Sequence, residues 1–229
     1  MRDFNMQFKA IVFDMDGTLI DSMQLWRDVD AEFLGKRKIP IPADLFDHLP
    51  SGNSFIQTAL YFKERFGLED SVGSIMREWT DMVSWHYLNT VVLKAGAREA
   101  LEYIKSLGLP LGLGTSNSWE LAEQVLSAQG IWDYFNTVVT GDMELMGKPY
   151  PDIYLKNAEE LGLLPEECLV IEDTLTGIQA AKAARMTAWA IYDADSNSQR
   201  RQIKELADEH HDDYGSILNR LKSIYQGTK

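Results

Sequence analysis

The sequence has little cysteine and no long hydrophobic run. Its 229 residues include a single cysteine, Cys168, which excludes an intramolecular disulfide framework and favours a reducing compartment. No segment holds 18 uninterrupted apolar residues, and no apolar region typical of a signal peptide precedes the first strand-like run. We therefore expect a cytoplasmic protein that does not cross a membrane.

Positive charge is also scarce. The chain has 35 acidic residues against 22 lysines and arginines, a formal net charge of −13. A surface of this sign repels nucleic acid and anionic membranes, so neither is an expected partner. A small anionic substrate needs only local positive charge and stays compatible with this composition. Composition does not determine the oligomeric state, for which a monomer is our expectation.

The apolar pattern changes period along the chain. A short apolar run at 8–14 predicts a strand that ends at a glycine turn. Residues 22–90 place apolar side chains at helical spacing, interrupted by proline-rich turn sequence. From about residue 91 onward, strand patterns alternate with helix patterns, which is typical of βαβ units. We predict an α/β fold with a Rossmann-like, mostly parallel sheet core and a small inserted helical bundle.

Polar side chains follow four of the predicted strands. In open parallel sheets, ligands bind beyond the carboxyl ends of the strands. This rule selects Asp14, Thr115, the segment 141–148, and the pair Glu172–Asp173. Because the carboxyl ends of parallel strands meet at one edge, agreement among four positions argues for a shared site more strongly than any one motif.

The stretch FDMDGTLIDS places two carboxylates just after the first strand. The carboxylate of Asp14 can act as a nucleophile toward phosphorus and form an aspartyl-phosphate. Asp16, two residues later, can protonate the leaving oxygen and then deprotonate a water molecule. Gly17 permits a sharp backbone turn beside the bound group. The alternative is a simple Asx turn, which the three other positions disfavour.

The stretches GTSNS and GKPYPDIY offer groups for an anion. Thr115, Ser116 and Asn117 lie between a strand and a helix, where hydroxyl and N–H groups can bind an anion. A plain helix N-cap explains these three residues equally well. Lys148, between a glycine and a proline, can neutralise a transferring phosphoryl group. Taken alone, it is better explained as a solvent-exposed lysine.

The stretch VIEDTLTG places Glu172 and Asp173 at the end of an apolar strand. Carboxylate oxygens at such a position suit Mg²⁺, which takes one or two carboxylates together with water and substrate phosphate. The alternative is an acidic helix start with Asp173 or Thr174 as N-cap. Repulsion from Asp14 and Asp16 across the sheet edge favours the cation.

Together these stretches resemble the four motifs of the haloacid dehalogenase superfamily, in the same order. The inserted helical block resembles the small C1-type cap of the beta-phosphoglucomutase-like, subfamily I phosphatase branch. The likeness runs through nearly the whole chain. It implies a Rossmann-like core over residues 1–20 and 91–229 and a four-helix cap over residues 21–90. The motifs that carry it read FDMDGTLIDS, GTSNS, GKPYPDIYL and IEDTLTGIQAA.

The resemblance assigns roles to individual residues. Asp14 would be nucleophile and metal ligand, and Asp16 would be general acid and base, with its backbone carbonyl also binding metal. Thr115 and Lys148 would hold the transferring phosphoryl group, with Ser116 and Asn117 beside them. The expected Mg²⁺ site is completed by Asp173, with Glu172 next to it.

Asp16 also helps to distinguish the reactions of this superfamily. Dehalogenases need no acid for a phosphoryl leaving group, and phosphonatases carry no aspartate there. We predict a Mg²⁺-dependent phosphatase that acts on a small phosphorylated metabolite. The alternatives are a sugar-phosphate mutase and a non-catalytic binding module. The mutases resembled here carry a histidine twelve positions after the nucleophile and a cap-loop arginine, where this chain has Trp26 and Phe55.

Substrate specificity in this architecture is expected in the cap. The candidate contact loop contains Gly52, Asn53 and Ser54, and an ordinary interhelical turn explains these residues equally well. A phosphorylated sugar, polyol, short acid or nucleotide would fit. Near the C-terminus, the polar segment 207–218 makes the last strand uncertain, and we interpret His210 and His211 as part of a solvated edge rather than a metal cluster.

Overall fold

A computed structural model describes residues 7–45 and 54–226 and contains a six-stranded parallel sheet. Every neighbouring pair of strands is parallel, in the order β3-β2-β1-β4-β5-β6. The predicted α/β fold with a parallel sheet is confirmed. The strands are β1 Ala10–Phe13, β2 Leu111–Gly114, β3 Thr137–Val139, β4 Cys168–Glu172, β5 Thr187–Ile191 and β6 Glu209–His211.

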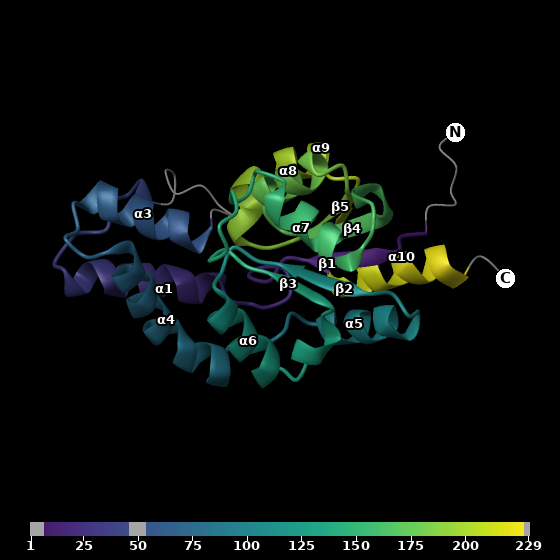
Figure 1. The fold of residues 1–229 in the computed structure, drawn as a ribbon, viewed down its shortest axis with the longest axis horizontal. Helices are drawn as coiled ribbons and strands as arrows, with labels where there is room; N and C mark the ends of the chain where they lie inside the picture. The colour runs from purple at the N-terminus through teal and green to yellow at the C-terminus, as the bar shows by residue number, and fades with distance from the viewer. Residues whose placement is uncertain (1–6, 46–53, 227–229) are drawn as a thin grey trace.

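Helices cover both faces of this sheet (Figure 1). The pleat of β1 points Ile11 and Phe13 into one apolar core, and Ala10 and Val12 into the other. Both faces of β1 are therefore buried, as its continuous apolar sequence requires. The first core includes α5 Ala97–Ser106, α6 Trp119–Ala128 and α10 Tyr214–Gln226; the second includes α7 Asp152–Leu161, α8 Leu175–Ala183 and α9 Arg200–Leu206.

Three further helices lie to one side of the sheet region (Figure 1). They are α1 Met23–Lys36, α3 Phe55–Phe66 and α4 Val72–Asn89. An aromatic cluster joins them, because the Trp79 ring lies 5.4 Å from that of Phe33 and 5.1 Å from that of Phe62. The inserted helical bundle is thus confirmed. Its predicted fourth helix and its boundaries at residues 21 and 90 stay predictions.

Two chain segments connect this bundle to the sheet, and they run side by side. Ile20 forms an antiparallel bridge with Leu93. The Asp21 N–H donates to the Val92 carbonyl at 3.1 Å, and the Lys94 N–H donates to the Leu19 carbonyl at 2.9 Å. Because the first segment leaves directly from β1, the bundle is attached at the carboxyl edge of the sheet.

The C-terminal strand corrects one expectation. β6 pairs with β5 in parallel register, so the polar segment does contain a strand. His211 does not lie on a solvated edge: it is buried, and its ring lies 5.0 Å from that of Trp189. Among the described residues, no helix is both long and apolar enough to cross a membrane.

Candidate functional site

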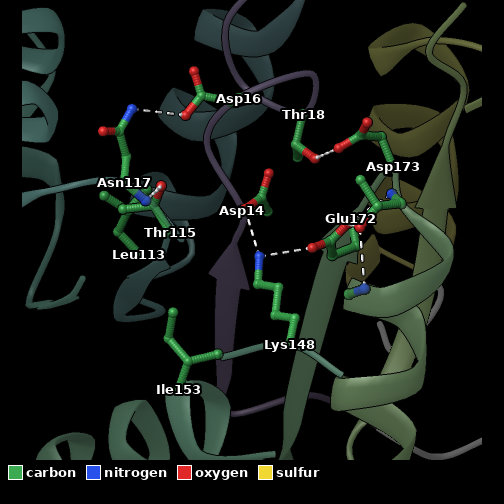
Figure 2. Close-up of polar contacts among 12 residues, drawn as sticks. Asp14, Asp16, Thr18, Leu113, Thr115, Asn117, Lys148, Ile153, Glu172 and Asp173 are labelled. Atoms are coloured by element: carbon green, nitrogen blue, oxygen red, sulfur yellow. Dashed lines mark hydrogen bonds and ion pairs between the residues drawn. The ribbon is translucent and has the colours of Figure 1, made fainter. Parts of the chain in front are cut away.

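Strand register brings the predicted site residues to one edge of the sheet. Phe13, the last residue of β1, pairs with Leu113 of β2 and with Ile171 of β4. The residues that follow these three positions therefore meet at the carboxyl edge. Figure 2 shows the result: Asp14, Asp16, Thr115, Glu172 and Asp173 surround one space, although they come from three strands.

Lys148 lies at one side of this group and contacts two of its carboxylates. Its ammonium nitrogen Nζ lies 2.6 Å from Asp14 Oδ1 and 2.7 Å from Glu172 Oε1 (Figure 2). The side chain is only 2% exposed, so the interpretation as a solvent lysine is wrong. A buried ammonium is stable only beside opposite charge, and the two carboxylates supply that charge. They hold the pKa of Lys148 well above its usual value, although burial opposes this.

Each carboxylate oxygen of Glu172 accepts two hydrogen bonds from the protein. Its Oε1 accepts from Lys148 and from the Tyr154 hydroxyl at 3.1 Å. Its Oε2 accepts from the Thr174 backbone N–H at 2.7 Å and from the Thr174 hydroxyl at 3.0 Å. These bonds give Glu172 the role of fixing Lys148 beside Asp14. Thr174, not Asp173, is the N-cap of α8, so the Asp173 carboxylate is not used for capping.

Three buried carboxylates gather tightly enough to hold a cation. Asp14, Glu172 and Asp173 each place one oxygen within 4.8 Å of the others. Burial, helped by the charge of Glu172, raises the pKa of Asp14 to about 7 against the opposing pull of Lys148. Burial also raises the pKa of Asp173 well above its usual value. When all three carboxylates are ionised, a single lysine balances only one of their negative charges, so the donor set fits a divalent cation with oxygen ligands.

Gly17 allows the chain to pass close to this cluster. Its φ of +79° belongs to the left-handed region, and a β-carbon there would lie 2.6 Å from Asp173 Oδ2. The next residue, Thr18, donates from its hydroxyl to Asp173 Oδ1 at 2.8 Å. The DGT sequence thus places a turn and a hydrogen-bond donor against Asp173.

Asp16 lies apart from the carboxylate cluster, and its side chain is not among the three candidate ligands. Asn117 donates from Nδ2 to Asp16 Oδ2 at 3.2 Å (Figure 2). Oδ1 accepts from Ser22, the residue before α1, at 2.6 Å. Two aromatic side chains of the helical bundle, Trp26 and Tyr87, also donate to Oδ1. A predicted metal contact of Asp16 would therefore have to come from its backbone.

Only the last residue of the GTSNS stretch caps the helix that follows it. The N-cap of α6 is Ser118, whose side chain accepts from the Leu121 N–H, so the N-cap interpretation of Thr115, Ser116 and Asn117 is wrong. Thr115 is fully buried, and its hydroxyl accepts from the Asn117 N–H at 3.1 Å. The Ser116 carbonyl accepts from the Phe55 N–H at 2.8 Å, which joins the sheet region to α3.

The candidate specificity loop is only partly described. Gly52 and Asn53 lie outside the described residues. Ser54 is buried and forms the N-cap of α3, where its hydroxyl accepts from the Gln57 N–H at 3.2 Å. This local contact explains Ser54 without a substrate, and its predicted binding role stays a prediction.

Sequence analysis missed Tyr87 and Tyr154, which contact the predicted site residues. Both are fully buried and lie in helices, α4 and α7. Tyr87 is 71 residues from Asp16, and Tyr154, the last residue of the GKPYPDIY stretch, is 18 residues from Glu172. Helical periodicity assigns such positions to the apolar core, which describes their rings correctly. It gives no signal for the hydroxyl groups.

Known proteins resemble this chain in sequence and in fold. A family model described as a haloacid dehalogenase-like hydrolase matches residues 8–185. A "Phosphorylated carbohydrates phosphatase" from Thermotoga maritima is 32% identical over 179 residues, which cover 77% of this chain and 81% of that protein. "Hexitol phosphatase B" from Escherichia coli K12 is 30% identical over 185 residues, covering 79% and 82%.

A solved structure shares the fold. The crystal structure of beta-phosphoglucomutase from Clostridium difficile matches with a TM-score of 0.78 and 22% identity, over 96% of this chain and 98% of that one. This likeness supports the expected beta-phosphoglucomutase-like architecture. The family model covers most of the chain, and the chain belongs to the haloacid dehalogenase-like hydrolases.

Proposed function

We propose that this protein is a Mg²⁺-dependent phosphatase that hydrolyses a small phosphorylated carbohydrate through an aspartyl-phosphate on Asp14. One observation carries the proposal: a buried carboxylate at the end of β1 lies between a buried lysine and a second buried aspartate. That arrangement suits a nucleophile for phosphorus, because Lys148 can balance the phosphoryl charge while Asp14 attacks. The assignment to phosphoric monoester hydrolases is confirmed by the relatives that bear phosphatase names.

In the first chemical step, the phosphoryl group passes from the ester to Asp14. An Asp14 carboxylate oxygen attacks the phosphorus, the bond from phosphorus to the ester oxygen breaks, and Asp16 gives its proton to that oxygen. In the second step, Asp16 takes a proton from water, whose oxygen attacks the phosphorus and releases Asp14. The products are the alcohol and inorganic phosphate, and both aspartates return to their starting states.

The metal would be held by Asp14 and Asp173, with the backbone carbonyl of Asp16 as a further predicted ligand. When bound, a divalent cation would offset the negative charge that Lys148 alone leaves unbalanced. It would thereby reduce the repulsion between the carboxylates and an anionic ester. Thr18 and Lys148 fix the orientation of the two side chains through the bonds described above. Thr115 and Asn117 provide polar groups on the opposite side of the space.

A phosphate-release assay tests this proposal. The purified protein is incubated with Mg²⁺ and a panel of phosphorylated hexoses, hexitols, short acids and nucleotides, and inorganic phosphate is measured. During turnover, borohydride trapping should convert Asp14 to homoserine, which mass spectrometry of the peptide detects. We expect release from at least one sugar or polyol phosphate, together with trapping at Asp14. A protein that cleaves no member of the panel would instead be a non-catalytic binding module.

A sugar-phosphate mutase is the competing function, because it shares the fold and the nucleophile. A mutase returns the phosphoryl group to its sugar and must grip a second phosphate. The two positions where the resembled mutases carry histidine and arginine hold Trp26 and Phe55. Their rings pack edge to face, with centroids 6.1 Å apart. Indole is no base, so Trp26 cannot replace the histidine, and a phenyl ring cannot pair with phosphate, so Phe55 cannot replace the arginine. With beta-glucose 1-phosphate and a bisphosphate primer, we expect phosphate release to exceed isomerisation; faster isomerisation would make the mutase the correct function.

A further inference from the structure

The carboxylate of Asp16 is held mainly by groups from the helical bundle. Its Oδ1 accepts from the Ser22 hydroxyl at 2.6 Å, from Trp26 Nε1 at 3.1 Å and from the Tyr87 hydroxyl. Its Oδ2 accepts only from Asn117 Nδ2, at 3.2 Å, among the bonds found within residues 7–45 and 54–226. The two oxygens thus differ. Oδ1 accepts from three donors, whereas Oδ2 accepts from one and can still carry a proton toward a ligand.

The direction of the Tyr87 hydrogen bond follows from its neighbours. The Tyr87 hydroxyl oxygen lies 3.0 Å from Trp26 Nε1 and 3.0 Å from Asn117 Nδ2. Both nitrogens are donors only, so the hydroxyl oxygen accepts from them, and the single N–H of Trp26 is shared between this oxygen and Asp16 Oδ1. Its single proton is then left for Asp16 Oδ1. Tyr87 is fully buried, so water does not compete for this arrangement.

These contacts connect parts of the molecule that are far apart in sequence. Trp26 comes from α1 and Tyr87 from α4, whereas Asn117 follows β2 in the sheet region. The bundle is inserted between β1 and the rest of the sheet, and the two segments that lead into and out of it pair at Ile20 and Leu93. Donors from α1 and α4 therefore reach Asp16 only while the bundle is seated against the carboxyl edge of the sheet.

We propose that Trp26 and Tyr87 are positioning residues for the general acid: they fix Oδ1 of Asp16 so that Oδ2 carries the proton to the leaving oxygen of the ester. The proposal rests on the phosphatase function proposed above and adds residues from the bundle to it. In the step concerned, the Oδ2–H bond breaks and an O–H bond forms on the leaving alcohol, while Asp14 bonds to phosphorus. Neither aromatic side chain exchanges a proton with the substrate.

A test must separate positioning of the acid from general support of the bundle. The leaving group provides that separation. An alkyl phosphate leaves as a basic alkoxide and needs a proton, whereas 4-nitrophenyl phosphate leaves as a weakly basic phenolate and needs little help. The measured quantity is kcat/KM, which reports the steps up to transfer of the phosphoryl group and not the later attack of water.

Tyr87→Phe and Trp26→Phe are the two test variants, because each removes a donor and keeps an aromatic ring. Trp79→Phe is the matched control: Trp79 is buried in the same bundle, in α4, and its indole N–H has no hydrogen-bond partner within the described part of the chain. Circular dichroism and thermal unfolding of each variant check that the bundle is folded. The substrates are sorbitol 6-phosphate and 4-nitrophenyl phosphate.

For Tyr87→Phe and Trp26→Phe, we expect kcat/KM on the alkyl phosphate to fall about ten- to a hundredfold, within the range that general acid catalysis supplies. On 4-nitrophenyl phosphate, the fall should stay below about threefold. Trp79→Phe should change both substrates by the same factor. If one variant does not fold, the other decides the outcome.

Two results would overturn the inference. Equal losses on both substrates would show that the aromatic residues only support the bundle, and unchanged rates would show that Asp16 is held without them. Failure of the proposed function gives a different pattern, because the wild-type protein would then cleave neither substrate, and the positioning role would fall with it.

Discussion

Lys148 and Asp14 form a buried ion pair in which Nζ lies 2.6 Å from Oδ1, with the lysine only 2% exposed. Glu172 contacts the same nitrogen at 2.7 Å. The lysine therefore has two anionic partners, and Asp14 is the one that faces the space shared with Asp16 (Figure 2). Glu172 can therefore stay paired with Lys148 when Asp14 reacts. The ammonium group remains beside the position where a phosphoryl group would bond to Asp14.

Replacing Asp14 by asparagine separates its chemical role from its structural role. The amide keeps the shape but lacks the nucleophilic charge. Because Lys148 still has Glu172 as a partner, we expect the fold to persist. We expect kcat to drop by more than about a hundredfold, which corresponds to several kcal/mol in the barrier. Phosphate release and thermal unfolding are measured side by side; a folded variant with more than about a hundredth of the wild-type rate contradicts the assignment.

Removal of divalent metal should stop turnover. Three buried carboxylates, those of Asp14, Glu172 and Asp173, lie close together, and Lys148 pairs with only two of them. An anionic ester adds further negative charge. We expect EDTA to abolish phosphate release and added Mg²⁺ to restore it. Ca²⁺ should bind without supporting comparable rates, because its longer and looser coordination places the phosphoryl group differently. Full activity after dialysis into metal-free buffer would refute the requirement.

Much of the core site could be predicted because parallel strands share one edge. Asp14, Thr115 and Asp173 directly follow or closely follow apolar strands, and the register brings these strand ends together. Lys148 lies in the longer segment after β3, and only its observed bond to Asp14 distinguishes it from a solvent-exposed lysine. The ambiguous parts were the N-caps. Ser, Thr and Asp serve both as helix caps and as ligand groups, and only the observed bonds assign capping to Ser118 and Thr174.

The contribution of the bundle could not be predicted in the same way. Trp26 and Tyr87 lie 10 and 71 residues from Asp16 in sequence, and aromatic residues at helical spacing indicate a core. Their polar atoms matter only because α1 and α4 are packed at the sheet edge. The apolar pattern of each strand predicts where the strand ends. The position of the helical bundle at the sheet edge depends on tertiary packing, which no local pattern predicts.

Gly177 should be intolerant of any side chain. It lies in α8, and a β-carbon there would meet Glu172 Oε1 at 1.7 Å, which displaces the carboxylate that fixes Lys148. We expect Gly177→Ala to lower the free energy of unfolding by about 1–3 kcal/mol, as overpacking does, and to reduce phosphate release as well. Urea unfolding and kcat are the measurements.

Gly73→Ala is the control for that substitution. Gly73 lies in α4, and a β-carbon there would meet nothing within 4 Å. Because alanine is favoured over glycine in helices, we expect this variant to be unchanged or stabilised by up to about 1 kcal/mol. If both alanine variants behave alike, the close approach of α8 to Glu172 is not what makes Gly177 necessary.

Asp30 should make stability depend on pH. It lies in α1 and is only 9% exposed, and burial raises its pKa from 3.8 to about 7. The folded state therefore binds a proton more tightly than the unfolded state does. The associated stability is fully present below about pH 4 and is lost as the pH rises toward 7. Between pH 5 and pH 8, this one group should lower the free energy of unfolding by about 2–3 kcal/mol.

The measurement is urea unfolding at pH 5 and pH 8 for the wild type and two variants. Asp30→Asn removes the titrating group, so its loss of stability between the two pH values should be about 2–3 kcal/mol smaller than that of the wild type. Asp28→Asn, at an exposed position of the same helix, should keep the pH dependence of the wild type. If the Asp30 variant also keeps it, the Asp30 carboxyl group is ionised in the folded protein at pH 5, and burial has not raised its pKa.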